Sequence, residues 1–478
     1  MSIKQNKLAL AFKFMYLILA IITFNVYTGK TPVNQYFSYA VFGFGVVVFL
    51  FRLFSFKEYK TTKGLYLLIA FSALSVVSAL VNFRFGGKTD LIENAQSLSW
   101  MLFCFFILYA YNAGTTKEDI KKEFTGISYF LLLYNFLACA AGAFLIAADR
   151  GMIIVRNGET VLGGFLWNRL WGVYTDPNHG AVVAGVCIIL SLYHLIIRKN
   201  AVMTVAHIIN IILCEFYIAC SDSRTGLVSL MASLAVFAFL YLMKRQIKFV
   251  DCKRLVKCAF CCLMAILIAL LPYFASDVTK TTVSKIKISI AGGNAPTDNP
   301  KNDSALIIGR NENPDSTDIS TDPSNRRLDI WKSGLDIVKK TPLVGTSFRG
   351  MVSFAEKNLP DTYILNNDSG KFNCMHNSLL DILVGQGILG LAVFAAFAIL
   401  VLVTCLKNLP KVKKEEDFLL LSTLYTVVFL IAVSSLFLSQ IIFINSIGGI
   451  LFWMFLGYAV NYMSLSVSEE EPLCQKSL

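Results

Sequence analysis

The chain has 478 residues, of which 56% are hydrophobic and 15% are charged, and its mean hydropathy is +0.62. A soluble domain carries about a quarter charged residues, so this composition excludes an ordinary soluble protein and indicates a membrane protein. The net charge of +12 does not indicate a nucleic-acid partner, because lysines and arginines concentrate in short loops between apolar segments. Membrane lipids are the expected surroundings, and no nucleic-acid partner is expected.

About twelve segments are apolar over a length that can cross a bilayer, for which a helix needs roughly 20 residues. Strands of a membrane barrel would be about ten residues long and would alternate in polarity, which these segments do not. The sequence therefore predicts an all-α polytopic membrane protein. In chain order, the predicted spans cover residues 8–27, 36–54, 64–83, 97–111, 125–147, 180–197, 201–220, 224–243, 256–275, 382–406, 416–437 and 440–462.

Charge in the loops predicts the orientation of these spans. With twelve spans and the N-terminus inside, all the short basic loops fall on the cytoplasmic side, as the positive-inside rule requires. Both termini are then cytoplasmic, and the polar segments 84–96, 148–179 and 276–378 lie outside. The first apolar run is long enough to span and lacks a small-x-small cleavage site, so no cleavable signal peptide is expected. The basic loops are 52–63, 117–123, 198–200, 244–257 and 407–416.

The expected organisation is one membrane domain interrupted by one large extracytoplasmic loop. Residues 1–275 carry spans 1–9, residues 276–378 form the loop, and residues 379–478 carry spans 10–12 and a cytoplasmic tail. Within the loop, residues 291–325 are rich in Asn, Asp, Ser, Thr, Gly and Pro, a composition that predicts flexibility. Residues 326–345 are predicted to contain an amphipathic helix that lies against the membrane domain or the lipid headgroups.

The pattern behind that helix is an apolar stripe at helical spacing. The polar positions between the stripe residues give the helix a second, solvated face. Pro342 is expected to end the helix and Gly345 to mark the turn that follows. The residues of the stripe are Leu328, Trp331, Leu335 and Val338.

Four outer arginines are the candidate anion-binding residues. Arg224 lies at the outer start of span 8, where the positive-inside rule disfavours a cation and an unpaired charge costs a few kcal/mol; a snorkelling side chain or an ion pair with Asp222 is the alternative. Arg326 and Arg327 open the amphipathic helix, where positive charge opposes the helix dipole, so a use beyond stability is indicated. A headgroup-facing helix start is the alternative for these two.

The fourth outer arginine, Arg169, precedes a second group of polar residues in the sequence RLWGVYTDPNHGA. Asp176 and Asn178 in this segment are candidates to support a site, although they could also simply cap span 6. His179 follows them directly.

Of the four histidines, His194 and His207 sit in apolar spans and are expected to be packed. His376 instead opens span 10 at the outer mouth and is followed by Asn377. A neutral histidine there can orient or deprotonate an acceptor hydroxyl. The nearness of His376 in sequence to the arginines favours this role over a purely structural one.

Arginine and histidine together suit the transfer of a sugar from a polyprenyl diphosphate. Arginine grips a departing diphosphate bidentately without a metal, and histidine handles the acceptor proton. No acidic metal motif stands out in the outer loops, and P-loop, GxGxxG and GxSxG motifs are absent. The cysteines at 258, 261 and 262 lack other ligands, so no metal site and no cofactor are expected.

At these residues the chain resembles the O-antigen ligase and Wzy O-antigen polymerase superfamily of bacterial membrane glycosyltransferases. The order of the motifs, the twelve spans and the long outer loop before the His-Asn pair also match this superfamily. The matching segments are SRTG at 223–226, RLDIW at 327–331, PLVG at 342–345, HNSLLDILVGQGILG at 376–390 and RLWGVYTDPNHGA at 169–181.

The resemblance implies a helical GT-C-type fold and a metal-independent transfer of a glycan from undecaprenyl diphosphate, at the outer face of the bacterial cytoplasmic membrane. It also implies that His376 activates the acceptor and that Arg224 and Arg327 hold the diphosphate, with Arg326 able to substitute for its neighbour. The chain departs from the family in one place, because Gly345-Thr346-Ser347 lacks the second glycine of the usual G-x-G. The residues expected to support the site are Asn377, Arg169, Asp222, Asp176 and Asn178.

Two enzyme activities and one other class of protein are compatible with these features. A polymerase of surface-polysaccharide repeat units is favoured, and a ligase that attaches the glycan to lipid A core or another acceptor is the alternative. Both would use an undecaprenyl-diphosphate-linked oligosaccharide and a glycan or lipid acceptor, with a chain-length regulator or a flippase as further partners. A transporter of lipid-linked glycans is disfavoured, because such proteins usually show internal repeats and broken or charged helices at the membrane midplane.

Overall fold

The structure is a computed structural model, and helices predominate in it, with fourteen α-helices among the residues it describes. The prediction of an all-α polytopic membrane protein is thereby confirmed, with one small sheet as an addition. The structure describes residues 2–111, 114–156, 158–197, 200–245, 254–290, 308, 324, 326–367 and 370–475. Most of the segment 291–325, predicted to be flexible, therefore lies outside the described residues.

Each of the twelve predicted spans corresponds to one helix, although spans 8–27, 64–83, 97–111, 416–437 and 440–462 extend beyond the helix at one or both ends. Within the described residues, ten of these helices are long and apolar enough to cross a membrane. The two that fall short of this criterion are α3, which is apolar but has 17 residues, and α1. The helices are α1 Ser2–Thr23, α2 Pro32–Phe54, α3 Leu65–Val81, α4 Phe83–Phe103 with a π-helical continuation Cys104–Tyr109, α5 Lys117–Ala147, α6 Pro177–Ile197, α7 Ala201–Ser221, α8 Arg224–Lys244, α9 Arg254–Ile290, α13 Ser378–Asn408, α14 Glu415–Ser434 and α15 Ile447–Gln475.

The centre of the bundle is formed by α6, α14 and α15, which are mostly buried, whereas α2, α9 and α13 expose much of their apolar surface. Trp453 of α15 marks the centre: it is 1% exposed, donates its indole N–H to Ile441 O at 2.8 Å, and contacts the Phe105 ring at 4.7 Å. Large apolar faces of this kind on the outer helices are what a bilayer covers.

Two polar segments predicted as loops are helical instead. The segment 84–96, expected as a polar outer loop, is the first part of α4, which bends at Gly87 (φ 64°). Helix α9 continues past residue 275 to Ile290. In both cases a polar sequence stays helical beyond its apolar run because the helix packs on a neighbour, α4 against α3 and α9 against α8.

A three-stranded antiparallel sheet, not predicted from the sequence, occupies part of the outer segment 148–179. It consists of β1 Gly151–Arg156, β2 Glu159–Leu166 and β3 Arg169–Gly172, in the order β1-β2-β3. Trp167 and Asn168 both have positive φ (51° and 55°), so β2 and β3 join through a two-residue turn of the primed type. Asn-Gly or Asp-Gly usually marks such a turn, and Trp-Asn does not carry that signal.

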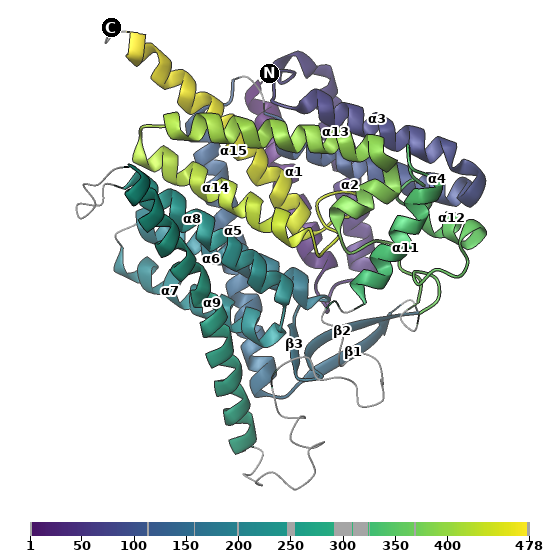
Figure 1. Cartoon of the computed structure of the whole chain (residues 1–478), viewed down its shortest axis with the longest axis horizontal. Helices are drawn as coiled ribbons and strands as arrows, with labels where there is room; N and C mark the ends of the chain where they lie inside the picture. Colours follow the sequence, from purple (N-terminus) through teal and green to yellow (C-terminus); the bar gives the residue numbers. More distant parts are fainter. Residues whose placement is uncertain are drawn as a thin grey trace.

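The sheet gathers with two short helices at one side of the bundle. Helix α11 (Arg327–Lys340) lies where the amphipathic helix was predicted, and α12 (Met351–Asn358) follows it. Figure 1 shows the sheet, α11 and α12 on the side of the bundle opposite the start of α1 and the end of α15. The polar residues singled out in the sequence lie on this side.

The buried face of α11 differs from the predicted apolar stripe. Leu328 and Leu335 are 60% and 48% exposed, and the helix instead buries Ile330, Ser333, Gly334 and Ile337. Gly334 is the reason, since a Cβ at this position would meet the Met375 sulfur at 2.6 Å. A glycine therefore lets α11 lie close to the segment that carries His376.

Candidate active site

His376 lies in a backbone conformation that its neighbours hold in place. Its φ is +49°, in the left-handed region, which costs roughly 1–3 kcal/mol for a residue other than glycine. On one side, Met375 N–H donates to Asp381 Oδ1 at 2.7 Å. On the other, the Asn377 side chain caps α13 by accepting from Leu379 N and Leu380 N at 3.0 and 3.1 Å. The predicted supporting residue Asn377 thus fixes the backbone beside His376.

Helix α11 is tied to the same loop. The Trp331 indole N–H donates to Met375 O at 3.0 Å, immediately before His376. Arg327 lies one turn before Trp331 on α11, so this hydrogen bond couples the arginine-bearing helix to the histidine. Phe372 contacts the His376 ring edge to face at 5.9 Å.

The charges that act on His376 come from two segments, α11 and the start of α6. Burial lowers the pKa of His376 below its usual value; the Asp176 carboxylate opposes this shift, while the positive charges of Arg327 and His179 add to it. The half-buried ring is therefore neutral at neutral pH. A neutral imidazole that faces both an arginine and a carboxylate can accept a proton and be stabilised once it has done so.

The segment between β3 and α6 connects Arg169 to Ser223, the residue directly before Arg224. Arg169 donates from Nε to Ser221 O at 2.6 Å and from a terminal nitrogen to Asn178 Oδ1 at 3.3 Å. The same Asn178 oxygen accepts from Ser223 Oγ at 2.9 Å. Ser223 is the N-cap of α8, directly before Arg224. Asn178 therefore joins the start of α6 to the start of α8, and Arg169 acts through it.

Asp176 differs from Asn178 in its role at the start of α6. Asp176 Oδ1 accepts from Asn178 N at 2.8 Å, in the manner of a capping residue, and its other oxygen lies 4.0 Å from His179 Nε2. Of the two residues that the sequence suggested as caps of span 6, only Asp176 therefore acts as one. His179 itself is buried, and its ring contacts the Phe24 ring in a tilted arrangement with centroids 4.8 Å apart.

Asp222 and Arg224 flank the turn between α7 and α8. Asp222 ends α7 in the left-handed region (φ 46°) and forms an ion pair with Lys280, on the part of α9 beyond the predicted span. Arg224 is the first residue of α8 and is exposed. Lys280 is thus a partner of Asp222 that the sequence did not indicate, because α9 was expected to end before it.

Arg326 and Arg327, which the sequence could not separate, differ in their surroundings. Arg326 is the N-cap of α11 (φ 62°), pairs with Asp329 at 3.3 Å and lies over the Tyr363 ring at 5.6 Å. Arg327 is the residue whose charge acts on the pKa of His376. Of the two, Arg327 is accordingly the candidate for the site.

The turn after α11 packs on a break in α13. Gly387 has φ 66°, and the opened backbone accepts new partners: Ile388 N donates to Pro342 O at 2.8 Å and Thr346 N to Val384 O at 2.9 Å. Gly345 (φ 65°) fits only without a side chain, since a Cβ would lie 2.4 Å from Val384 O. The PLVG and VGQG sequences thus form one interlocked unit.

Ser347 stands where the family's G-x-G has its second glycine and adopts the backbone conformation of a glycine. Its φ is 61°, the left-handed conformation that a second glycine would adopt readily. Its hydroxyl accepts from Asn94 Nδ2 at 3.1 Å and from Gly350 N at 3.2 Å, while its N–H donates to Ser78 Oγ at 2.8 Å. Hydrogen bonds therefore hold the turn that the missing glycine put in doubt.

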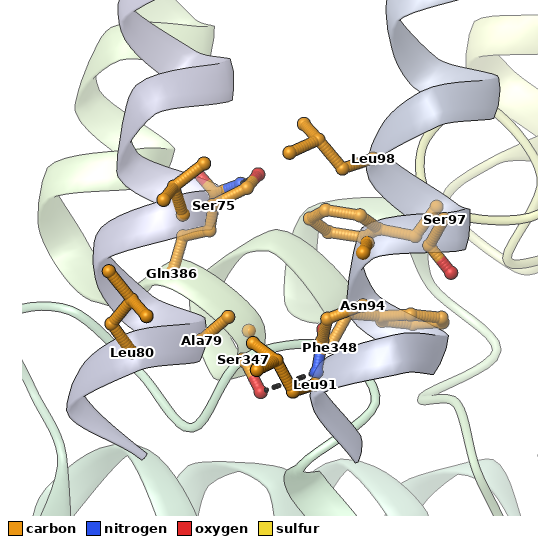
Figure 2. A pocket seen from close by; sticks show the side chains of 14 residues that line it. Ser75, Ala79, Leu80, Leu91, Asn94, Ser97, Leu98, Ser347, Phe348 and Gln386 are labelled. Carbon is orange, nitrogen blue, oxygen red and sulfur yellow. Dashed lines mark hydrogen bonds between the residues drawn. The ribbon is translucent and has the colours of Figure 1, made fainter. Parts of the chain in front are cut away.

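Beside this unit, a narrow slot runs between α3 and α4, as Figure 2 shows. Its volume is about 100 Å³, and Leu80, Leu91 and Leu98 make it largely apolar. Gln386 is the main polar group: its Nε2 donates to Ser75 Oγ, and its side chain is 1% exposed. The slot lies beside the break in α13, not beside His376.

Two further residues of the site escaped sequence reasoning. Asp381 is buried in α13 and positions Met375, and Trp331 was assigned to an apolar stripe although its indole N–H positions the same residue. Among the described residues, no group of three or more His, Cys, Asp or Glu side chains could hold a metal ion.

Residues 208–395 match a family described as O-antigen ligase. The match confirms the resemblance drawn from the motifs, and it spans Arg224, Arg327 and His376 but not the segment 169–181. No curated protein matches the chain.

Proposed function

We propose that this membrane glycosyltransferase of the O-antigen ligase and polymerase type joins the repeat units of a surface polysaccharide. The donor would be a glycan on undecaprenyl diphosphate, and the acceptor a sugar hydroxyl, at the outer face of the bacterial cytoplasmic membrane. The polyprenyl donor and the roles of His376, Arg224 and Arg327 follow from the family resemblance, and the site geometry supports the pairing of Arg327 with His376.

The observation that carries the proposal is the coupling of Arg327 to His376. The Trp331–Met375 hydrogen bond at 3.0 Å joins their two segments, and the charge of Arg327 is felt at the His376 ring. The arginine that could stabilise a leaving diphosphate is thereby held near the histidine that could take the acceptor proton, as glycosyl transfer requires.

The reaction can be written on these residues. An acceptor hydroxyl oxygen attacks the anomeric carbon while His376 takes the hydroxyl proton. The bond from that carbon to the diphosphate oxygen breaks, and its electron pair leaves with the diphosphate. Arg327 and Arg224 stabilise the charge that develops there, and Asp176 stabilises the imidazolium.

A lipid-linked substrate also needs an apolar approach to the site. Leu379 follows Asn377 and is 42% exposed, Leu343 lies in the turn after α11 and is 63% exposed, and Leu328 next to Arg327 is 60% exposed. Apolar side chains exposed beside cationic and polar ones suit a polyprenyl chain whose diphosphate sits at the headgroup level.

The experiment is to compare the surface glycan of cells carrying His376→Ala with that of wild type on a gel. Loss of long chains, with single repeat units still attached to the final acceptor, is the expected result and means polymerase. Loss of all attached glycan, with long lipid-linked chains accumulating, would mean ligase instead. Lys371→Ala is the matched control, because Lys371 lies on the same loop, is exposed and pairs with Glu356. An unchanged pattern for His376→Ala would overturn the proposal.

A further inference from the structure

A second cavity lies beside the α1–α2 connection. Its volume is about 470 Å³, within the roughly 300–1,000 Å³ of small-molecule sites. Parts of α1, α2, α4, the β1–β2 hairpin and the α14–α15 connection line it. The polar and aromatic lining includes Asn34, Gln35, Tyr39, Gln96, Trp100 and Asn445.

Helix α2 presents a polar stripe to this cavity. Thr31, Asn34, Gln35 and Ser38 recur at the spacing of one helical face, and all four line the cavity. The rest of α2 is apolar, and its exposed residues Val47, Leu50 and Phe51 are suited to lipid. A row of amides and hydroxyls at one end of an otherwise lipid-facing helix indicates that the end faces a polar ligand.

Aromatic rings form the inner wall. Trp100 stacks on Tyr16 with ring centroids 4.9 Å apart and planes 21° from parallel. The Tyr16 hydroxyl donates to Asn445 Oδ1 at 2.8 Å, so the NH₂ group of Asn445 can donate elsewhere. Flat aromatic faces beside amides are the chemistry that recognises sugars, which carry both apolar C–H faces and hydroxyl edges.

The charges of the cavity cancel. Lys30 and Glu159 both line it and form an ion pair with each other across the α1–α2 connection and β2. With these two opposed, the remaining lining is amide, hydroxyl and aromatic. Such a surface suits uncharged sugars, including acetamido sugars, better than uronic acids or phosphates.

The walls of the cavity are continuous with the candidate active site. Phe24 lies between the lining residues Thr23 and Lys30; its ring contacts His179, and its carbonyl accepts from Thr175 N at 3.0 Å. The α14–α15 connection that carries Asn445 also holds the start of α13, where Ser378 N donates to Ser435 O at 2.8 Å. The cavity is therefore built from the same segments that position His376 and Asp176.

We infer that this cavity is a carbohydrate subsite that holds uncharged sugar units of a glycan substrate beside the bond to be made. The inference rests on the proposed transferase function and adds to it the class of sugar and the residues that bind it. The α2 stripe and Gln96 would bind hydroxyl or acetamido groups, and Tyr39, whose side chain is exposed, would contact a sugar face.

Calorimetric titration of the purified full-length protein in lipid nanodiscs tests this inference. The probe is the soluble oligosaccharide released by mild acid from the host's own surface glycan. Ser38→Trp fills the cavity and is expected to weaken binding at least about tenfold, or about 1.4 kcal/mol. Ala40→Trp places the same ring on an exposed face of α2 that does not line the cavity, and should bind as wild type does. Gln96→Leu removes one amide at similar volume and should weaken binding less than Ser38→Trp does.

His376→Ala separates failure of the inference from failure of the proposed function. It should lose transfer in cells yet bind the oligosaccharide as wild type does. Normal transfer by His376→Ala would defeat the proposed function whatever the binding result. Equal binding by Ser38→Trp and Ala40→Trp, or no binding to wild type at millimolar oligosaccharide, would overturn the subsite even if His376→Ala is inactive. Gln96→Leu keeps the test decisive if Ser38→Trp fails to fold, because unchanged binding by Gln96→Leu would then overturn the subsite.

Discussion

Two groups of charges in this molecule contrast with each other. The first lies between α5, α14 and α15, where Lys117 and Asp417 form an ion pair with side chains only 7% and 5% exposed. The Asp417 carboxylate also accepts from Tyr462 OH, and Lys117 reaches Glu469 at 2.9 Å. Opposite charges are paired and buried there, and such pairing is how a folded chain tolerates buried charge.

The second group surrounds His376, and its charges are arranged differently. Arg327 acts on the His376 ring from α11, and Asp176 and His179 act on it from the start of α6; the ring is half-buried. Its backbone is strained at φ +49° and held by Asp381, Trp331 and Asn377. The contrast suggests that the first group serves stability and the second serves chemistry, and it can be tested by substituting a cation in each.

Arg327→Gln is expected to give the largest effect on transfer. Loss of the cation that stabilises a departing diphosphate should lower the rate of glycan transfer roughly 100- to 1,000-fold with little change in Tm. Transfer assayed with lipid-linked substrate in membranes measures this. The matched control is Arg326→Gln, which removes a neighbouring cation engaged with Asp329 and Tyr363 and should cost far less. Equal losses for the two variants would refute the assignment of Arg327.

Gly345→Ala should cost several kcal/mol of stability, because the turn has φ +65° and a Cβ would lie within 2.6 Å of three backbone atoms of α13. A lower Tm and reduced transfer are both expected, since the turn joins α11 to the break in α13. Gly370→Ala is the control: it also has positive φ (87°), but its Cβ would meet nothing within 4 Å, so roughly 1 kcal/mol is expected. Equal Tm values for the two variants would show that packing against α13 is not what fixes this glycine.

Lys117→Met tests the buried Lys117–Asp417 ion pair. It leaves Asp417 buried beside only Lys121 at 3.3 Å and the Tyr462 hydroxyl, so a loss of about 3 kcal/mol is expected. Thermal unfolding in detergent should show the lower Tm, whereas transfer per folded molecule should be unchanged. Lys117→Met combined with Asp417→Leu should recover much of the loss, because no buried charge is then left unpaired. A fall in transfer without a fall in Tm would place this group in the function after all.

How far the sequence alone could predict this structure depends on the range of the interactions. The spans followed from local composition, because an apolar run of about 20 residues has few alternatives to a membrane helix. The sheet did not, since β1 to β3 are short strands in a polar segment and the Trp167–Asn168 turn lacks glycine. Tertiary hydrogen bonds, not local propensity, stabilise such strands.

The candidate site also contains some residues that the sequence predicts and others that only the fold reveals. Arg224, Arg327 and His376 were proposed from motifs and their order, but nothing local indicated which of Arg326 and Arg327 acts on the histidine. That choice depends on the rotation of α11, which Gly334 sets by letting the helix approach Met375. Asp381, Trp331 and Lys280 were missed for the same reason, because each acts on a residue brought near by folding.

The smallest expected effect concerns the pH dependence of transfer. Burial lowers the pKa of His376 and Asp176 partly opposes this, so Asp176→Asn should lower the pKa further. A base with a lower pKa stays neutral to a lower pH, so the acid limb of the pH–rate profile should move to lower pH. The plateau rate should fall severalfold, because a weaker base transfers the proton less readily. Asn retains an oxygen to accept from Asn178 N, so the cap of α6 should survive and Tm should change little.

Asp336→Asn, on the surface of α11 and paired with Lys339, should leave the profile unchanged. An acid limb that stays in place or moves to higher pH in Asp176→Asn would mean that this carboxylate does not act on the base, and that His376 works in an electrostatic setting different from the one inferred here.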